Sequence, residues 1–160
     1  MKNLLTLVCI ISFLNLGCKK KACCVIIDTF VSINYVDADN ADLLDPTNPN
    51  VIKADDIEIY YLENGQKQRV YNGNLDLSKN FKILKTPNSD KYYLSLSVSA
   101  DLNENGISTT YLEVKKYNFT DTLTATIDKS SSSTRVNKVW YNGAYKGNAK
   151  EKTVTFTVVK

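Results

Sequence analysis

Strict alternation of apolar and polar residues constrains this chain more than any other feature. Residues 92–98 have an apolar side chain at every second position, with tyrosine or serine between them. Successive side chains of a strand point to opposite faces, so this pattern predicts a strand with one buried and one solvated face. A helix would need apolar residues three or four positions apart, and no segment of useful length shows that spacing. The alternation therefore predicts an all-β fold.

The same pattern recurs along the chain and predicts about eight strands. In the first, residues 25–35, one apolar face is expected to comprise Val25, Ile27, Val31, Ile33 and Tyr35. The others are expected at residues 57–62, 67–71, 92–98, 109–114, 122–127, 135–141 and 153–159. Asn64-Gly65 is a strong hairpin signal between the second and third strands. Short strands at this spacing predict a two-layer antiparallel β-sandwich, Ig-like or transthyretin-like, with a closed barrel around a ligand cavity as the alternative.

The N-terminus resembles a bacterial lipoprotein signal. A basic start is followed by an apolar run over residues 4–16, then by Gly17, Cys18 and three lysines. The run is shorter than the roughly 20 apolar residues that a membrane-spanning helix needs. The resemblance implies cleavage after Gly17, with residues 1–17 as signal peptide, and lipid attachment to Cys18. The alternatives are an ordinary secretory signal with an incidental cysteine, or a buried N-terminal helix.

This interpretation leaves residues 18–24 as lipid anchor and short tether, and residues 25–160 as one β-sandwich domain. The whole chain has a net charge of +3, and three lysines lie directly after Cys18, so the domain itself is close to neutral. Nucleic-acid binding requires a concentrated basic surface, which this distribution does not predict. We expect a protein anchored to a membrane of the cell envelope, namely the outer membrane, on its periplasmic face or at the cell surface.

Histidine and cysteine limit the chemistry that is open to the chain. It contains no histidine, which removes the usual general base, histidine-dependent nucleophiles and histidine-ligated zinc. With Cys18 lipidated, Cys23 and Cys24 remain in the mature chain. We expect them to be small buried side chains at the start of the first strand, or alternatively reactive thiols that cross-link two chains. No cofactor is expected, and a carboxylate-only hydrolase is the enzymatic alternative.

The acids for such a hydrolase would come from the longest irregular stretch, residues 37–56. It contains the aspartates Asp37, Asp39, Asp42 and Asp45 together with two prolines. A long loop on a rigid scaffold is a common place for function. The alternative, which we favour, is that these aspartates are solvated turn formers.

Asp101, Asn103 and Asn105 are candidate metal ligands, because with Gly106 they match the opening of a calcium loop. The full loop takes two further oxygens from a glutamate at its twelfth position, which here is Leu112. The interpretation that we favour is a hairpin loop in which Asn105 and Gly106 take left-handed conformations.

Thr122 is a candidate for modification. Asp121-Thr122-Leu123 resembles the acceptor of protein O-glycosylation in Bacteroidota, and this resemblance would place a glycan on Thr122. Three residues recur easily by chance, so the alternative is an ordinary strand threonine with β-branched propensity.

Aromatic residues provide a further candidate surface. Of ten tyrosines, the pairs Tyr60-Tyr61 and Tyr92-Tyr93 must put one ring on each face of a strand. Outward rings could stack on sugars or form a protein-binding patch, and the alternative is cross-strand packing that stabilises the sheet. The single tryptophan, Trp140, is expected to fill the core or to cap one end of it.

Three tracts, residues 36–46, 57–62 and 138–143, are similar to those of small uncharacterised lipoproteins of Bacteroidota. The resemblance implies an all-β domain in the cell envelope and supplies no catalytic residues. Together with the missing histidine, it leads us to expect a non-enzymatic module that binds a carbohydrate or an envelope protein. The alternatives are the carboxylate-based envelope hydrolase and a steric inhibitor of an envelope enzyme.

Overall fold

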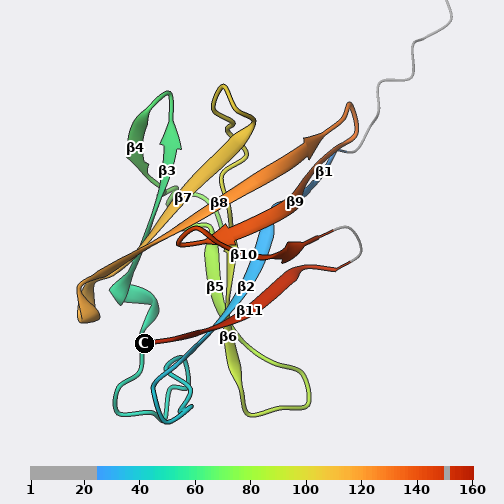
Figure 1. The fold of residues 1–160 in the computed structure, drawn as a ribbon. Coiled ribbons are helices and arrows are strands. Elements are labelled where there is room, and N and C mark those ends of the chain that lie inside the picture. Colours follow the sequence, from blue (N-terminus) through green and yellow to red (C-terminus); the bar gives the residue numbers. More distant parts are fainter. Residues whose placement is uncertain (1–24, 150–151) are drawn as a thin grey trace, which may run out of the picture.

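The computed structural model describes residues 25–149 and 152–160. Within these ranges the chain forms eleven strands and two short 3-10 helices, and the strands lie in two sheets (Figure 1). The predicted all-β sandwich is therefore confirmed. The predicted signal peptide, the candidate lipidation site Cys18 and the predicted tether with Cys23 and Cys24 lie outside the described residues.

The larger sheet has seven strands in the order β1-β9-β8-β7-β3-β4, with β10 also paired to β9. Their bounds are β1 Ile26–Asp28, β3 Ile57–Glu63, β4 Gln66–Arg69, β7 Ile107–Val114, β8 Phe119–Lys129, β9 Ser133–Tyr141 and β10 Ala144–Asn148. Asn64 and Gly65 join β3 to β4 with φ angles of 50° and 76°. Positive φ at both positions suits the tight turn that a two-residue hairpin needs, so the predicted hairpin is confirmed.

The smaller sheet has four strands in the order β11-β2-β6-β5. Their bounds are β2 Phe30–Val36, β5 Phe81–Lys85, β6 Tyr92–Ser97 and β11 Val154–Val159. The 3-10 helix η1, Ala54–Asp56, forms the end of the residue 37–56 loop, and η2, Lys115–Tyr117, follows β7. The longer strands of both sheets give one face to a shared core, whereas the edge strands β1 and β4 are exposed.

The core confirms the alternation on which the fold was predicted. Leu94 and Leu96 of β6 are fully buried, as are Leu112 and Val114 of β7 in the other sheet. Leu43, Leu44 and Ile52 from the residue 37–56 loop join the same cluster. This long loop therefore packs against the core with its apolar side chains while its polar residues face solvent.

The first predicted strand is divided in the structure. Val31, Ile33 and Tyr35 are buried as expected, but Val25 and Ile27 are 57% and 68% exposed. The chain leaves one sheet for the other at Thr29, whose hydroxyl hydrogen bonds that of Ser97 at 2.7 Å. As a result β1 is a short edge strand of the large sheet, and β2 is a central strand of the small one.

Two further features differ from the sequence-based expectation. β5 and β10 were not predicted, and together with the division of the first strand they raise the number of strands from about eight to eleven among the described residues. The sheets are also mixed rather than antiparallel, because β1 pairs β9 and β11 pairs β2 in parallel. Both parallel pairs join segments that are far apart in sequence, where no local pattern sets the direction. The strands nevertheless form two separate sheets, not the closed barrel considered as the alternative.

Candidate functional site

The outer face of the seven-stranded sheet carries two adjoining rows of aromatic and threonine side chains. Strand register aligns one row across β3, β7 and β8, formed by Tyr60, Tyr111 and Thr122. It aligns the next row across β7, β8, β9 and β10, formed by Thr109, Thr124, Trp140 and Tyr145. Buried residues alternate with these positions along β7 and β8, so the rows point away from the core. We refer to these seven residues as the aromatic face.

Trp140 lies on this outer face, and the expectation that it fills or caps the core is wrong. It is the cross-strand partner of Tyr145, with ring centroids 5.6 Å apart, and Tyr145 is 55% exposed. The register between β8 and β9 skips Asn137, which is a β-bulge. Because a bulge shifts the alternation by one residue, it places Val139 and Tyr141 inside and turns Trp140 outward.

Lys67 of β4 holds the two tyrosines of the first row together. Its ammonium lies 4.4 Å from the ring centroid of Tyr60 and 5.1 Å from that of Tyr111. The same ammonium forms an ion pair with Glu113. A cation over two ring faces is attracted to both, so Lys67 limits the motion of these rings. Tyr61, in contrast, points inward and donates its hydroxyl to the Ser97 carbonyl at 2.9 Å, as the alternation predicted.

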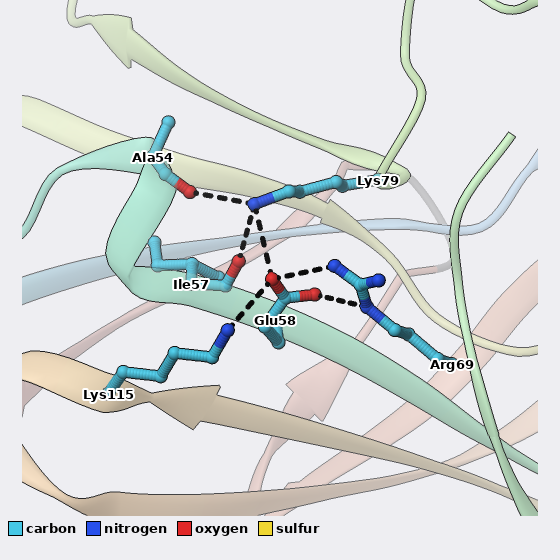
Figure 2. Close-up of polar contacts among 6 residues, drawn as sticks. All are labelled: Ala54, Ile57, Glu58, Arg69, Lys79 and Lys115. Carbon is cyan, nitrogen blue, oxygen red and sulfur yellow. Dashed lines mark hydrogen bonds and ion pairs between the residues drawn. The ribbon is translucent and has the colours of Figure 1, made fainter. Parts of the chain in front are cut away.

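Glu58 lies beside the first row and is surrounded by three cations (Figure 2). Arg69 donates from Nε to Oε2 at 2.7 Å and from Nη2 to Oε1 at 2.9 Å, which is a bidentate pair. Lys115 donates to Oε1 at 3.2 Å, and the Lys79 ammonium lies 3.6 Å from the same oxygen. The Glu58 side chain is only 4% exposed, since these cations cover it.

These contacts fix the ionisation state of Glu58. The hydrogen bond from Arg69, with further help from Lys115 and Lys79, lowers the pKa of Glu58 from 4.5 to about 2 despite its burial. The carboxylate is therefore ionised at neutral pH, and its oxygens already accept hydrogen bonds. Such a group cannot donate a proton as a general acid near pH 7.

Lys79 also fastens the connection between β4 and β5 to the start of β3. Its ammonium donates to the carbonyl oxygens of Ala54 at 3.3 Å and Ile57 at 3.1 Å (Figure 2). The donors of Lys79 are thus used within the fold. Arg69 and Lys115 have side chains that are 52% and 61% exposed, and each retains N–H donors that point to solvent.

A cleft of about 720 Å³ opens at the other end of the same strands. It lies between the β3–β4 turn and the residue 98–106 loop, and Leu62 and Thr109 form its floor next to the aromatic face. The side chains around it are mostly polar and include Asn64, Asp101, Glu104 and Lys129. The cleft extends the aromatic face with groups that can hydrogen bond a ligand.

The candidate metal ligands Asp101, Asn103 and Asn105 all line this cleft. The Asn103 side-chain oxygen accepts from the backbone N–H groups of Asn105 and Ile107, both at 3.0 Å. This oxygen therefore shapes a turn, as asparagine commonly does. No group of three metal-binding acids, cysteines or histidines was found in the described part of the chain.

The interpretation of the residue 98–106 loop as a hairpin is wrong, because the loop crosses between sheets. It connects β6 of the small sheet to β7 of the large one, and the N–H of Ser99 donates to the Thr110 hydroxyl at 2.9 Å. Of the Asn105-Gly106 pair, Gly106 has positive φ, at 73°, and Asn105 does not.

Asp121 forms a second polar cluster, inside the sandwich. Its carboxylate accepts from Lys160 Nζ at 2.7 Å, from Asn142 Nδ2 at 2.9 Å and from the Tyr35 hydroxyl at 3.2 Å. Burial, reinforced by the charge of Asp121, raises the pKa of Tyr35 well above its ordinary value. Burial likewise raises the pKa of Tyr141, so both phenols stay protonated. The cluster joins the two sheets, and its carboxylate and both phenols are buried.

A smaller cavity of about 390 Å³ lies near this cluster, where the loop after β2 meets η2. Its aromatic wall consists of Tyr117 and Phe119, stacked with centroids 6.4 Å apart. The Lys160 ammonium lies 3.7 Å from the Phe119 centroid. Since that ammonium already pairs with Asp121, the cavity offers an apolar wall and few polar groups that are still available.

Aspartates of the residue 37–56 loop accept hydrogen bonds from nearby backbone. The Asp37 carboxylate accepts from Asp39 and Ala41, and that of Asp45 accepts from Thr47. Asp42 accepts from Leu44 and, across the fold, from the N–H of Tyr92 at 2.6 Å. These carboxylates act as turn formers, in keeping with the interpretation that we favoured.

Comparison with protein-family models, curated proteins and solved structures found no match for this chain. Fold and side-chain geometry are therefore the basis for any functional assignment. The structure brings Thr122 into the aromatic face next to Tyr111, and its backbone N–H donates to Asn142 Oδ1 at 2.8 Å. No helix among residues 25–149 and 152–160 is long and apolar enough to cross a membrane.

Sequence reasoning missed Glu58 and its partners, although a signal was present. The hairpin at Asn64-Gly65 sets a register in which Tyr60 is opposite Arg69. Glu58 is then a diagonal neighbour of Arg69 on the same face, and such pairs are within reach of long side chains. Lys79 and Lys115 are supplied by other elements, and no local pattern places them there.

Proposed function

We propose that this protein is a lipid-anchored lipoprotein of the cell envelope that binds a carbohydrate through its aromatic face, without catalysis. The observation that carries the proposal is the pair of outward rows formed by Tyr60, Tyr111, Trp140 and Tyr145 with threonines between them. Large aromatic side chains that point to solvent on a rigid sheet commonly mark a binding surface.

Carbohydrate fits this surface better than an apolar partner does. Flat aromatic rings can pack against the C–H faces of sugars, while hydroxyl and amide groups hydrogen bond sugar hydroxyls. The aromatic face supplies two pairs of rings with threonine hydroxyls between the pairs, and the adjoining cleft adds Asn64 and Asn103. A protein ligand, including an envelope enzyme that this chain would inhibit sterically, is the competing outcome of the test below.

The proposal of binding without turnover rests on the state of the carboxylates. Glu58 has a pKa of about 2 and Asp121 is closed to solvent. The carboxylates of Asp37, Asp42 and Asp45 accept hydrogen bonds from local backbone. Glycoside hydrolysis requires two opposed carboxyl groups, one of which is protonated near neutral pH. None of these five acids offers that arrangement.

The anchor is part of the same proposal. Lipid on Cys18 would confine the sandwich to the outer-membrane surface, where weak contacts gain effective concentration. A Cys18→Ala variant should accumulate as an uncleaved precursor that is not labelled by palmitate. Normal labelling of that variant would contradict the lipoprotein assignment.

Binding should be measured with the full-length lipoprotein on an array of envelope and plant glycans. Trp140→Ala and Tyr111→Ala should each lower the affinity for a retained glycan at least tenfold, because anchoring aromatic residues commonly contribute about 2 kcal/mol or more. Tyr93→Ala, on the outer face of the small sheet, is the matched control and should bind normally. Release of shortened glycan would instead indicate a hydrolase, and retention of an envelope protein alone would indicate the protein-ligand alternative.

Thr122 provides an independent check. A glycan attached to Thr122 would cover the aromatic face next to Tyr111, so modification at this residue and ligand binding by the face exclude each other. Intact-mass measurement of the mature protein should show acyl chains and no sugar. A hexose-containing mass that disappears in Thr122→Val would favour the modification.

A further inference from the structure

We infer that the ligand of the aromatic face is an anionic carbohydrate whose acidic group, a carboxylate or sulfate, binds between Lys67, Arg69 and Lys115. This inference rests on the proposed carbohydrate-binding function and specifies its ligand class. The supporting observation is the cation cluster around Glu58, which contains more cations than are needed to pair with Glu58. Arg69 alone already gives Glu58 a bidentate partner.

Two cations of this cluster, Arg69 and Lys115, are exposed while its central acid is covered. Arg69 and Lys115 are 52% and 61% exposed, against 4% for Glu58. Arg69 uses Nε and Nη2 on Glu58, so its Nη1 donors are free of that pair. A ligand approaching this end of the sheet meets N–H donors and does not meet the carboxylate beneath them.

The local charge is positive even after internal pairing. Four cations, Lys67, Arg69, Lys79 and Lys115, converge on the two carboxylates Glu58 and Glu113. The cluster therefore carries a net charge of +2. Charge-assisted hydrogen bonds from a planar guanidinium suit a carboxylate or sulfate, which can accept two of them in parallel.

The cations and the rings occupy one continuous surface. Arg69 is the direct cross-strand partner of Tyr60, and the Lys67 ammonium lies over both Tyr60 and Tyr111. Neighbouring strands are about 4.8 Å apart, so a sugar ring stacked on Tyr111 would hold its substituents within reach of these cations. The geometry provides stacking and charge recognition for the same ligand.

The surface at the opposite end of these strands does not suit an extended polyanion as the ligand. The cleft there is lined by Asp101 and Glu104 with one cation, Lys129. A nucleic acid or an anionic membrane surface carries charge along its whole length and would be repelled at this end. A glycan with an acidic group at one end and neutral sugars at the other matches both ends of the surface.

The test compares matched glycans that differ only in charge. One set consists of oligosaccharides with a terminal uronic acid and their methyl esters, and the other of terminally sulfated oligosaccharides and their desulfated forms. The full-length protein should bind at least one anionic member tenfold or more tightly than its neutralised form, since hydrogen bonds to charged groups are worth about that factor. The difference should shrink as salt is raised.

The Lys67→Gln/Lys115→Gln double variant should remove most of this preference, with Arg69 left in place. The neutral form should still bind to this variant, but less tightly than to the wild type, because Lys67 also holds Tyr60 and Tyr111 in position. The double variant leaves the Arg69–Glu58 pair intact, so it is expected to fold. Lys82→Gln/Lys91→Gln removes the same charge near the small sheet, where both lysines are exposed, and is the matched control.

Two results would overturn the inference, and they are distinguishable from failure of the proposed function. Equal affinity for anionic and neutral glycans would disprove charge recognition and leave carbohydrate binding intact. Equal or tighter binding of single-stranded DNA or of phosphatidylglycerol vesicles, lost in the same double variant, would show a general polyanion site. Failure of every member of both sets to bind would remove the carbohydrate proposal together with this one.

Discussion

The two sheets share one core but present different outer faces. In the small sheet, one register row across the outer face comprises Thr155, Ser32, Ser95 and Lys82. The corresponding row of the large sheet comprises Thr109, Thr124, Trp140 and Tyr145. The outer face of a sheet can be formed by a row of polar side chains without any aromatic ring, and the small sheet has such a row. The aromatic rings of the large sheet therefore require another explanation, and ligand binding provides one.

The faces also differ in how they hold charge. On the large sheet Glu58 is buried beneath Arg69 and Lys115, and Lys67 bridges Glu113 and two tyrosines. On the small sheet, Lys85 pairs with Asp90, an acid that is fully exposed. An exposed pair of this kind contributes little to stability. Of the two outer faces, the one that carries networked ion pairs is thus also the one that carries the aromatic rows.

The largest effect on stability is expected for a substitution on the inner face of the small sheet. Leu96→Ala should lower the free energy of unfolding by about 2–5 kcal/mol, because Leu96 is fully buried and its truncation leaves a cavity. Ser95→Ala, one residue away on the outer face, should change it by less than about 0.5 kcal/mol. Urea denaturation measures both. Equal losses would mean that the inner and outer faces of β6 are not distinguished as described.

The next effect concerns the charged part of the large sheet. The pKa of Glu58 is lowered to about 2 in the folded protein. The contribution of Glu58 to the free energy of unfolding is therefore fully present above pH about 4.5 and is lost as pH falls toward 2. The loss should amount to at most about 3 kcal/mol, reduced by solvent screening of Arg69 and Lys115. Unfolding curves at several pH values between 2 and 6 measure it.

Glu58→Gln provides the control for this pH dependence. The variant cannot titrate at this position, so its stability should fall less steeply than that of the wild type between pH 4.5 and 2. Parallel pH profiles for the two proteins would show that Glu58 does not hold the strong ion pairs assigned to it.

Outward aromatic residues should matter less for stability than Leu96. Tyr145→Ala removes one ring of the Trp140–Tyr145 pair, and such pairs are worth about 0.5–1.5 kcal/mol beyond their burial. We expect a loss in that range on urea denaturation, together with a clear loss of glycan affinity. A destabilisation as large as that of Leu96→Ala would indicate that these rings serve the fold instead.

The smallest effect is expected for calcium at the cleft next to the aromatic face. The side-chain oxygen of Asn103 is used by its own turn, and Leu112 occupies the place of the bidentate acid. Millimolar calcium should therefore leave the melting temperature unchanged. A real site at 100 times its Kd would add about 2.7 kcal/mol, so a rise in Tm that EDTA reverses would contradict this expectation.

Local patterns predicted the fold where the structure depends on local rules. The alternation in β6, β8 and β11 placed the correct side chains in the core, since period two is a property of a strand by itself. Asn64-Gly65 predicted its hairpin for the same reason. Asn142-Gly143 has φ angles of 48° and 81° and forms an equivalent turn, yet β10 after it was missed because Ala144–Asn148 lacks clear alternation.

Features that depend on distant parts of the chain were not predictable in this way. The bulge at Asn137 turns Trp140 outward, and a one-residue shift of this kind exchanges the faces of a strand. The chain passes from β1 in one sheet to β2 in the other at Thr29. The hydrogen-bond partner of Thr29 is Ser97, which is distant in sequence, so no local pattern marks this change of sheet. Glu58 is at a polar position of an alternating strand, where the pattern predicts a solvated residue. Its burial depends on Lys79 and Lys115, which other elements supply.

The most direct test of the central claim is to map the binding surface by NMR. Amide shifts of the full-length protein in detergent micelles should be followed while a uronate-terminated oligosaccharide is added. We expect concentration-dependent changes at residues 58–62, 67–69, 109–115, 122–126 and 138–145, and none around Ser95 and Lys82. Changes confined to the small sheet, or to the cavity whose aromatic wall is Tyr117 and Phe119, would contradict the claim that the aromatic face binds the ligand.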